Sequence, residues 1–288
     1  MRDYLQLHLV ILAWGFTAIL GKLITLPALD VTVWRTGLAA AGFGLVALAT
    51  RRSLRLPRLE TLKLLGIGWI IGWHWVLFFL AARLSTASVC LAAMPTGMLW
   101  CSLIEPLVNG RRRWHLGELV TGAVMVAAVA LIYQVELRYW LGLSVGLVSA
   151  LLAACFAVTN KQFAHRHAFA VLCFYEMAGA FAACVLTLPF FSHRLLALAP
   201  SRADLGWLLV LSLVCTVAAY AGYVDVLRRM SVFTINVVYN LEPVYGILLA
   251  ALVFGDKEKM SGGFYLGASV IVGAVLLMPL VRRPEPVP

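Results

Sequence analysis

The chain has 288 residues, of which 62% are hydrophobic and only 12% are charged, and its formal net charge is +10 at pH 7. The charged fraction is about half the value of roughly 25% that is typical of soluble proteins. This composition excludes an ordinary soluble domain, and ten apolar segments leave no length for a sizeable one.

Each of the ten segments is long enough to cross a bilayer. A span needs about 20 largely apolar residues, because the hydrocarbon core is about 30 Å thick and a helix rises about 1.5 Å per residue. Since the backbone in lipid must satisfy its own hydrogen bonds, the fold class is predicted to be all-α integral membrane. The predicted spans are 4–24, 30–49, 62–82, 86–108, 115–133, 139–160, 168–190, 205–227, 231–253 and 262–281.

The first span is predicted to stay in the protein. It lacks a small-residue cleavage site and continues through the short turn 26–30 into the second span, unlike a signal peptide. All six cysteines lie within predicted spans, and their spacings match no metal motif. They are interpreted as small packing residues, and no metal, cofactor or catalytic residue is predicted.

Basic residues are divided unevenly between the two ends of the predicted bundle. With ten spans both termini share one side, and that side carries 15 of the 23 Lys and Arg residues, including the run Arg111-Arg112-Arg113. The positive-inside rule makes this side cytoplasmic. We therefore predict a multi-pass protein of the bacterial inner membrane, with both termini cytoplasmic and the arginine run contacting lipid headgroups. No nucleic-acid partner is expected.

The second half of the chain weakly repeats the first. Residues 83–132 begin Arg-Leu-Ser and residues 229–278 begin Arg-Met-Ser, and Met94-Pro95 in one copy lies where Glu242-Pro243 lies in the other. Five spans per copy is an odd number, so the second copy enters the membrane from the opposite side. Two inverted five-helix repeats, 1–136 and 137–288, are predicted, with a site near the midplane, as is usual in secondary transporters.

Several short motifs occur in a characteristic order. They are Trp14-Gly15 in the first span, Asp30-x-x-x-Trp34-Arg35 in the second, Leu241-Glu242-Pro243-Val244-Tyr245 in the ninth and the turn Gly255-Asp256-Lys257-Glu258. With them the chain resembles the EamA-type members of the drug/metabolite transporter superfamily over essentially its whole length. The turn Asn109-Gly110-Arg111 departs from that family, which often has an acidic residue after its Gly. The resemblance implies a ten-helix carrier of metabolites or drugs, without naming the substrate.

Polar residues inside the spans indicate which helices line a pathway. Spans five and ten are nearly free of them and are expected to be peripheral. Spans one, eight and nine carry polar stripes at helical spacing, which either line a cavity or hold helices together. The candidate binding residues on these stripes are Trp14, Tyr223, Asn236, Tyr239 and Asn240.

Ionisable residues inside spans are expensive and mark candidate functional positions. Glu242 either binds a cation, a proton or a substrate amine, or is protonated and bonds to a neighbouring helix. His74 either titrates or bonds as a neutral ring to a backbone carbonyl. Glu176 is a second candidate for ion coupling. Arg35 either extends to the membrane interface or pairs with a carboxylate or a substrate anion.

Prolines and glycines complete the pattern. Pro95 and Pro243 are candidate hinges, because a proline cannot donate a backbone hydrogen bond; the ninth span is expected to bend at Pro243, leaving a carbonyl near Tyr239 free. Three Gly-x-x-x-Gly pairs, at 68/72, 142/146 and 263/267, predict close backbone packing between helices.

Together these patterns predict a secondary-active transporter that moves a small organic metabolite, for example an amino acid or other zwitterion, by alternating access. Export is favoured over import, and proton coupling is a hypothesis. The alternatives are an uncoupled facilitator of the same fold, an intramembrane enzyme acting on lipid, and a non-transporting assembly partner. No enzyme is expected, since the metal-binding, nucleophile and phosphate-loop motifs of common enzymes do not occur. The expected partners are the substrate, membrane lipids and protons, and the oligomeric state is left open.

Overall fold

The computed structural model describes residues 2–109, 116–163, 166–191, 199–227, 229–230, 238–239 and 241–281. Every regular element in that part of the chain is a helix. In order they are α1 Arg2–Leu23, α2 Ala28–Ala49, α3 Arg58–Leu84, α4 Ala87–Ala93, η1 Met94–Thr96, α5 Gly97–Asn109, α6 Leu116–Val135, η2 Leu137–Tyr139, α7 Trp140–Asn160, α8 Phe169–Phe191, α9 Arg202–Leu209, η3 Val210–Ala218, α10 Ala219–Leu227, α12 Glu242–Phe254, η4 Gly255–Glu258 and α13 Gly262–Val281.

Seven helical segments are long and apolar enough to cross a membrane, which supports a multi-pass membrane protein. They are Arg2–Leu23, Ala28–Ala49, Arg58–Leu84, Ala87–Val108, Leu137–Asn160, Phe169–Phe190 and Arg202–Val226. Two shorter apolar helices, Val120–Val135 and Gly262–Ala274, lie in α6 and α13. Wherever the predicted spans fall on described residues, helices occupy them to within a few residues.

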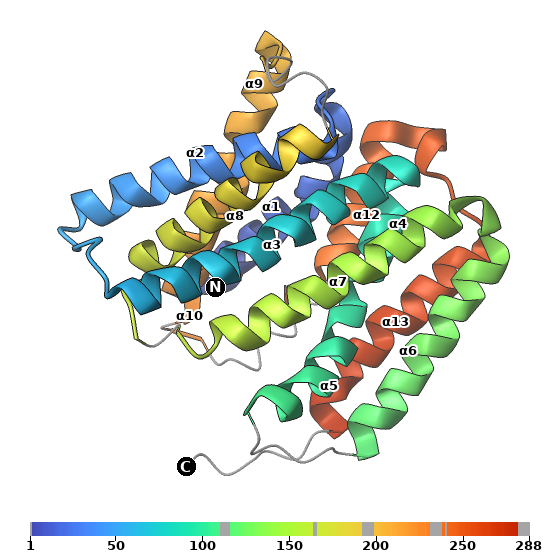
Figure 1. Cartoon of the computed structure of the whole chain (residues 1–288). Helices are drawn as coiled ribbons and strands as arrows, with labels where there is room; N and C mark the ends of the chain where they lie inside the picture. Colours follow the sequence, from blue (N-terminus) through green and yellow to red (C-terminus); the bar gives the residue numbers. More distant parts are fainter. Residues whose placement is uncertain are drawn as a thin grey trace.

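Helix α3 lies in the middle of the bundle, where it packs most extensively against α7 and α8 (Figure 1). Two glycines of α3 make this contact close. A Cβ at Gly68 would collide with the backbone of α8 at Glu176 and Gly179, and a Cβ at Gly72 would lie 3.0 Å from the Ala180 Cα. The close packing predicted for this Gly-x-x-x-Gly pair is therefore confirmed.

Helices α6 and α13 form a separate pair along one side of the bundle (Figure 1). They meet at the third glycine pair, because Gly263 packs against Val135 and Gly267 packs against Ile132. The hydroxyl of Thr121 donates to the carbonyl of Gly117 in its own helix at 2.8 Å. The pair thus carries the features of a supporting element.

Two of the predicted spans are interrupted near a proline. In the fourth, the short 3₁₀ turn η1 around Pro95 separates α4 from α5. In the ninth, Leu241 lies in a turn and α12 begins at Glu242, with Pro243 in its first turn. The expected bend at Pro243 is therefore the start of a helix, because a proline fits the first turn, whose N–H groups have no partner inside the helix. Residues 231–237 and Asn240 lie outside the described residues.

A third irregularity lies between α9 and α10, where η3 is a π-helix of nine residues. Its hydrogen bonds reach back five residues instead of four. The hydroxyl of Thr216 follows the same spacing and donates to the carbonyl of Leu211 at 2.9 Å. Such segments are rare and occur frequently at functional sites, and this one faces α2 and α1.

Candidate functional site

Four aromatic side chains gather where α1, α10 and Tyr239 meet. The ring of Trp14 lies 5.8 Å from that of Tyr220, 5.3 Å from that of Tyr223 and 5.7 Å from that of Tyr239, centroid to centroid. All four are at least partly accessible, and Tyr239 exposes 43% of its surface. We call these four residues the aromatic cluster. It brings together three of the predicted binding residues, Trp14, Tyr223 and Tyr239.

A glycine contact places the start of α12 beside this cluster. A Cβ at Gly15 would lie 3.0 Å from both the Glu242 carbonyl oxygen and the Gly246 amide nitrogen. A Cβ at Gly246 would lie 3.0 Å from the Gly15 carbonyl oxygen. The backbones of α1 and α12 therefore lie in close contact, and a Cβ on either glycine would force neighbouring atoms to shift. Because Gly15 follows Trp14 directly, this contact also holds Glu242, the first residue of α12, close to the aromatic cluster.

Arg35 lies inside the bundle. Its side chain is only 4% exposed, so the expectation that it extends to the membrane interface is wrong. The guanidinium lies over the ring of Trp75, with Cζ 3.9 Å from the ring centroid, and Nε donates to the hydroxyl of Thr216 at 3.1 Å. Stacking on an aromatic face stabilises a desolvated cation, which explains why an arginine is tolerated at this depth.

Glu242 is the acidic partner in the same region. Its side chain is half-buried, and it interacts electrostatically with both Arg35 and Tyr239. It also lies at the N-terminus of α12, where the helix dipole favours a negative charge. The region therefore contains one cation, one carboxylate and several aromatic faces, contributed by helices from both halves of the chain.

His74 is held by a neighbouring helix. Its Nδ1 lies 2.9 Å from the carbonyl oxygen of Ser149, and the Ser149 hydroxyl donates to the His74 carbonyl at 2.8 Å. These bonds join α3 to α7. They match the alternative in which His74 is a neutral ring bonded to a backbone carbonyl.

Glu176 lies on α8, apart from these groups. It is 1% exposed, and its Oε1 has no hydrogen-bond partner among the described residues. It interacts electrostatically with Tyr220 of the aromatic cluster and with Cys173. The two remaining candidates, Asn236 and Asn240, lie outside the described residues. No group of three or more His, Cys, Asp or Glu side chains in the described ranges could hold a metal ion.

Sequence reasoning included Tyr223 among the candidates of the eighth span but missed Tyr220. The two tyrosines are three residues apart in α10, so they lie on the same face of that helix, and both reach the ring of Trp14. The spacing in the sequence was therefore compatible with Tyr220, and the contact with Trp14 identifies it.

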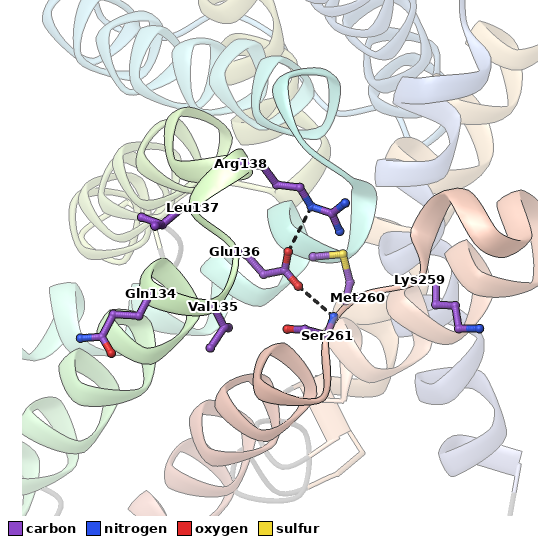
Figure 2. Close-up of a pocket in the computed structure, with 8 residues that line it drawn as sticks. All are labelled: Gln134, Val135, Glu136, Leu137, Arg138, Lys259, Met260 and Ser261. Atoms are coloured by element: carbon purple, nitrogen blue, oxygen red, sulfur yellow. Dashed lines mark hydrogen bonds and ion pairs between the residues drawn. The ribbon is translucent and has the colours of Figure 1, made fainter.

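A cavity of about 630 Å³ lies elsewhere, between η2 and the start of α13 (Figure 2). Glu136 lines it, accepting from the Ser261 amide at 2.8 Å and from Arg138 Nε at 3.3 Å. Figure 2 shows Arg138 and Lys259 with their charged ends apart. Because the cations do not converge on one point, this cavity is a weaker candidate site than the region around Trp14.

Comparison with known proteins agrees with the fold and names a family. Residues 140–280 match the EamA-like transporter family. A solved structure titled "Crystal structure of protein" is similar to 98% of this chain over 99% of its own length, with a TM-score of 0.66 and 19% sequence identity. At that identity the likeness shows a shared fold alone. No curated protein matches the chain.

Proposed function

We propose that this chain, whose residues 140–280 match the EamA-like transporter family, carries a small organic metabolite across the membrane by alternating access. The observation that carries this proposal is the region around Trp14. There four partly accessible aromatic rings lie beside Glu242, and the buried Arg35, which stacks on Trp75, interacts electrostatically with Glu242 and Tyr220. Ligand sites commonly combine apolar walls with a few placed polar groups.

The chemistry of this region suits a substrate with both charges. Glu242 can accept hydrogen bonds from a substrate ammonium, and Arg35 can donate to a substrate carboxylate. The aromatic cluster offers faces on which a planar or cationic group can stack. An amino acid or another zwitterion of similar size is the proposed substrate class.

The proposed architecture is ten spans in two inverted repeats, 1–136 and 137–288. The helix contacts support it, because they recur when the halves are exchanged. α3 packs on α8 as η3 packs on α2, and α5 packs on α7 as α12 packs on α1. The interruptions at Pro95 and Pro243 also occupy corresponding positions of the two halves. Such repeats place the site at their interface and allow one to rock against the other.

The direction and coupling follow as part of the proposal. The bias of basic residues towards the side of the termini supports cytoplasmic termini in a bacterial inner membrane. Glu242 is the proposed proton-coupling group, because it is accessible and lies beside the proposed substrate site. Export is the proposed direction, in line with the resemblance described above.

The test starts with purified protein and a thermal-shift screen of amino acids and other small metabolites. A ligand that binds the native state raises the melting temperature, and each hit is then assayed for flux into liposomes. The proposal is supported if the protein increases the flux of a hit, if Trp14→Ala reduces that flux and if Thr121→Ala does not. Product formation from a lipid substrate without any solute flux would instead support an intramembrane enzyme. Flux that is unaffected by Trp14→Ala would move the site elsewhere in the bundle.

A further inference from the structure

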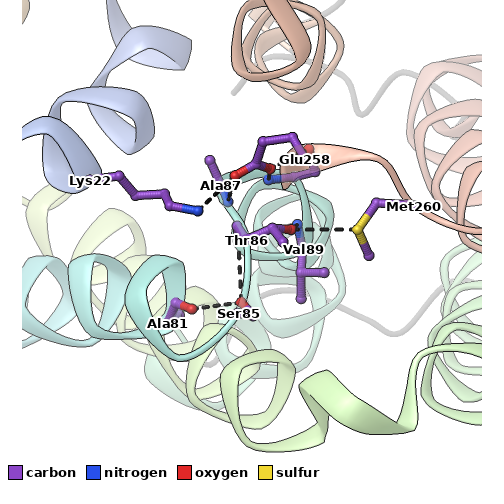
Figure 3. Close-up of polar contacts among 9 residues, drawn as sticks. Lys22, Ala81, Ser85, Thr86, Ala87, Val89, Glu258 and Met260 are labelled. Atoms are coloured by element: carbon purple, nitrogen blue, oxygen red, sulfur yellow. Dashed lines mark hydrogen bonds and ion pairs between the residues drawn. The ribbon is translucent and has the colours of Figure 1, made fainter. Parts of the chain in front are cut away.

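Glu258 is a buried carboxylate that is surrounded by hydrogen-bond donors. It ends η4, is 1% exposed and joins the cluster drawn in Figure 3. Oε1 accepts from Lys22 Nζ at 2.8 Å and from the Ala87 amide at 3.0 Å. Oε2 accepts from the Ser88 amide at 2.9 Å and from the Ser88 hydroxyl at 2.9 Å. A buried charge that is paired and fully hydrogen-bonded is stable where an unpaired one is not.

These bonds join three separate parts of the chain. Lys22 lies in the last turn of α1, Ala87 and Ser88 begin α4, and Glu258 follows α12. The first N–H groups of a helix have no partner within it. Thr86 accepts from the amide of Val89, and Glu258 accepts from the two amides before it. The start of α4 is thus satisfied by a carboxylate from the other half of the protein.

The helices that Glu258 joins are both short and end at a proline interruption. α4 runs from this cluster to η1 around Pro95, and α12 runs back from it to Glu242 and Pro243. They pack against each other through Leu91 of α4, which is fully buried against Gly246. Each therefore ends at an interruption of its span, and Glu258 ties their far ends together.

The polar contacts at the opposite end of α1 are different. Arg229 bonds to Asp3 at 2.8 Å and to Asp225 at 2.7 Å, and all three side chains are 38–49% exposed. Exposed ion pairs contribute little, because water competes for the charges. The end that carries Lys22 is held by a buried, saturated cluster, and the end that carries the N-terminus is held by solvated pairs.

The geometry points to Glu258 as the positioning residue of a gate on the side opposite the termini. In this conformation the carboxylate holds α1, α4 and the end of α12 together and seals the pathway above Trp14. Opening towards that side requires α4 and α12 to separate from α1, so that water replaces Lys22 and the α4 amides around the carboxylate. This inference rests on the proposed carrier function and assigns it a closing element.

The test measures how often the sealed face opens. Leu91→Cys places a thiol in the α4–α12 contact, and the rate of its reaction with a membrane-impermeant maleimide is measured from each side of oriented vesicles. The same proteins without Leu91→Cys report the background from the native cysteines. Glu258→Gln keeps the shape but can no longer accept through both oxygens, and Lys22→Gln removes the cation. Each is expected to raise the rate from the side opposite the termini by at least about tenfold, the population shift that follows loss of one charge-assisted bond.

Two controls separate a gate from general loosening. Glu136→Gln alters another buried carboxylate that bonds to the start of a helix, Ser261 before α13, but in the peripheral pair. It should leave the labelling rate unchanged, and so should Lys22→Arg, which keeps the cation. Gel filtration checks that each variant is folded.

Unchanged labelling in both Glu258→Gln and Lys22→Gln would overturn the gate. So would an equal rise in Glu136→Gln, or a rise only from the side of the termini. Labelling needs no substrate. If the variants show normal ligand-dependent flux and unchanged labelling rates, the gate is wrong but the carrier function stands. If the labelling rates rise as expected but the native protein shows no flux, the carrier function is wrong.

Discussion

The backbone of Gly15 in α1 lies in close contact with the backbone of Gly246 in α12, and a Cβ atom at either position would force neighbouring atoms to shift. This contact joins the first and second halves of the chain beside the aromatic cluster. It holds Trp14 near Glu242, the two groups that the proposed substrate would contact.

Gly15→Ala is expected to lower stability by about 1–3 kcal/mol, the usual cost of overpacking, and to reduce flux. The new Cβ would lie 3.0 Å from two backbone atoms of α12, which cannot rotate away as a side chain can. Thermal unfolding and flux measure the two effects. Gly66→Ala is the matched control, because a Cβ at that position would meet nothing within 4 Å. An equal loss in both variants would mean that the Gly15 contact has no special role.

Glu242→Gln is expected to leave the protein folded and to abolish the pH dependence of flux, because an amide keeps the shape of the side chain but cannot carry a proton. Glu176→Gln serves as the comparison, since Glu176 is buried at the α3–α8 contact and has less access to a substrate. Flux against pH is measured for both. If Glu176→Gln loses the pH dependence and Glu242→Gln keeps it, the coupling group is Glu176.

Arg35→Lys is expected to weaken substrate binding by about 10-fold or more. Lysine keeps the charge but loses both the flat stack on Trp75 and the Nε bond to Thr216, and the two cations are not interchangeable at a stacked site. Binding of a thermal-shift hit is measured by titration. Affinity equal to that of the native protein would show that Arg35 is a structural cation only.

Ser149→Ala is expected to cost about 1–3 kcal/mol of stability, because the His74 carbonyl and ring lose a buried hydroxyl partner. Affinity for substrate should stay unchanged, since the bonds of His74 run to α7 and not to the aromatic cluster. Thermal unfolding and ligand titration separate these effects. A change in substrate affinity without a change in stability would indicate that His74 belongs to the binding site.

The hydrogen bonds around Glu258 predict how opening of the proposed gate depends on pH. Burial alone would raise the pKa of the Glu258 carboxyl, but Lys22 and the amides of Ser88 and Ala87 outweigh it and hold that pKa below its usual value of 4.5. A depressed folded pKa contributes stability that is present above the unfolded value and is lost as pH falls through the folded one. The reactive thiolate becomes rarer as pH falls, so labelling of Leu91→Cys is expressed relative to that of a fully exposed cysteine at each pH. This relative rate should be constant from about pH 6 to pH 8 and rise only in stronger acid. A rise between pH 8 and pH 6 would contradict this assignment.

The positions of the helices were predictable because length and hydropathy determine a membrane span. The predicted span 62–82 lies within α3, and 139–160 almost coincides with α7. The spacing of Gly68 and Gly72 also predicted close packing of α3 on another helix, and the structure identifies that helix as α8.

The site was less predictable, because its contacts depend on register and on side-chain direction. Arg35 lies near a span end in the sequence, yet Trp75 from another helix makes its burial favourable. The sequence shows Glu258 only as part of a turn motif, since its four donors come from residues 170 or more positions earlier. Such contacts are set by the tertiary structure, and no local sequence pattern predicts them.

The π-helix at 210–218 makes the candidate site sensitive to how this segment winds. Each residue of a π-helix turns the chain by less than the roughly 100° of an α-helix, so a substitution that lets the segment relax to an ordinary α-helix would rotate everything after it about the helix axis. Tyr220 and Tyr223 would then face away from Trp14, although neither had been changed. Such a substitution would disrupt the proposed binding region while leaving the length of the chain and the number of membrane crossings as they were.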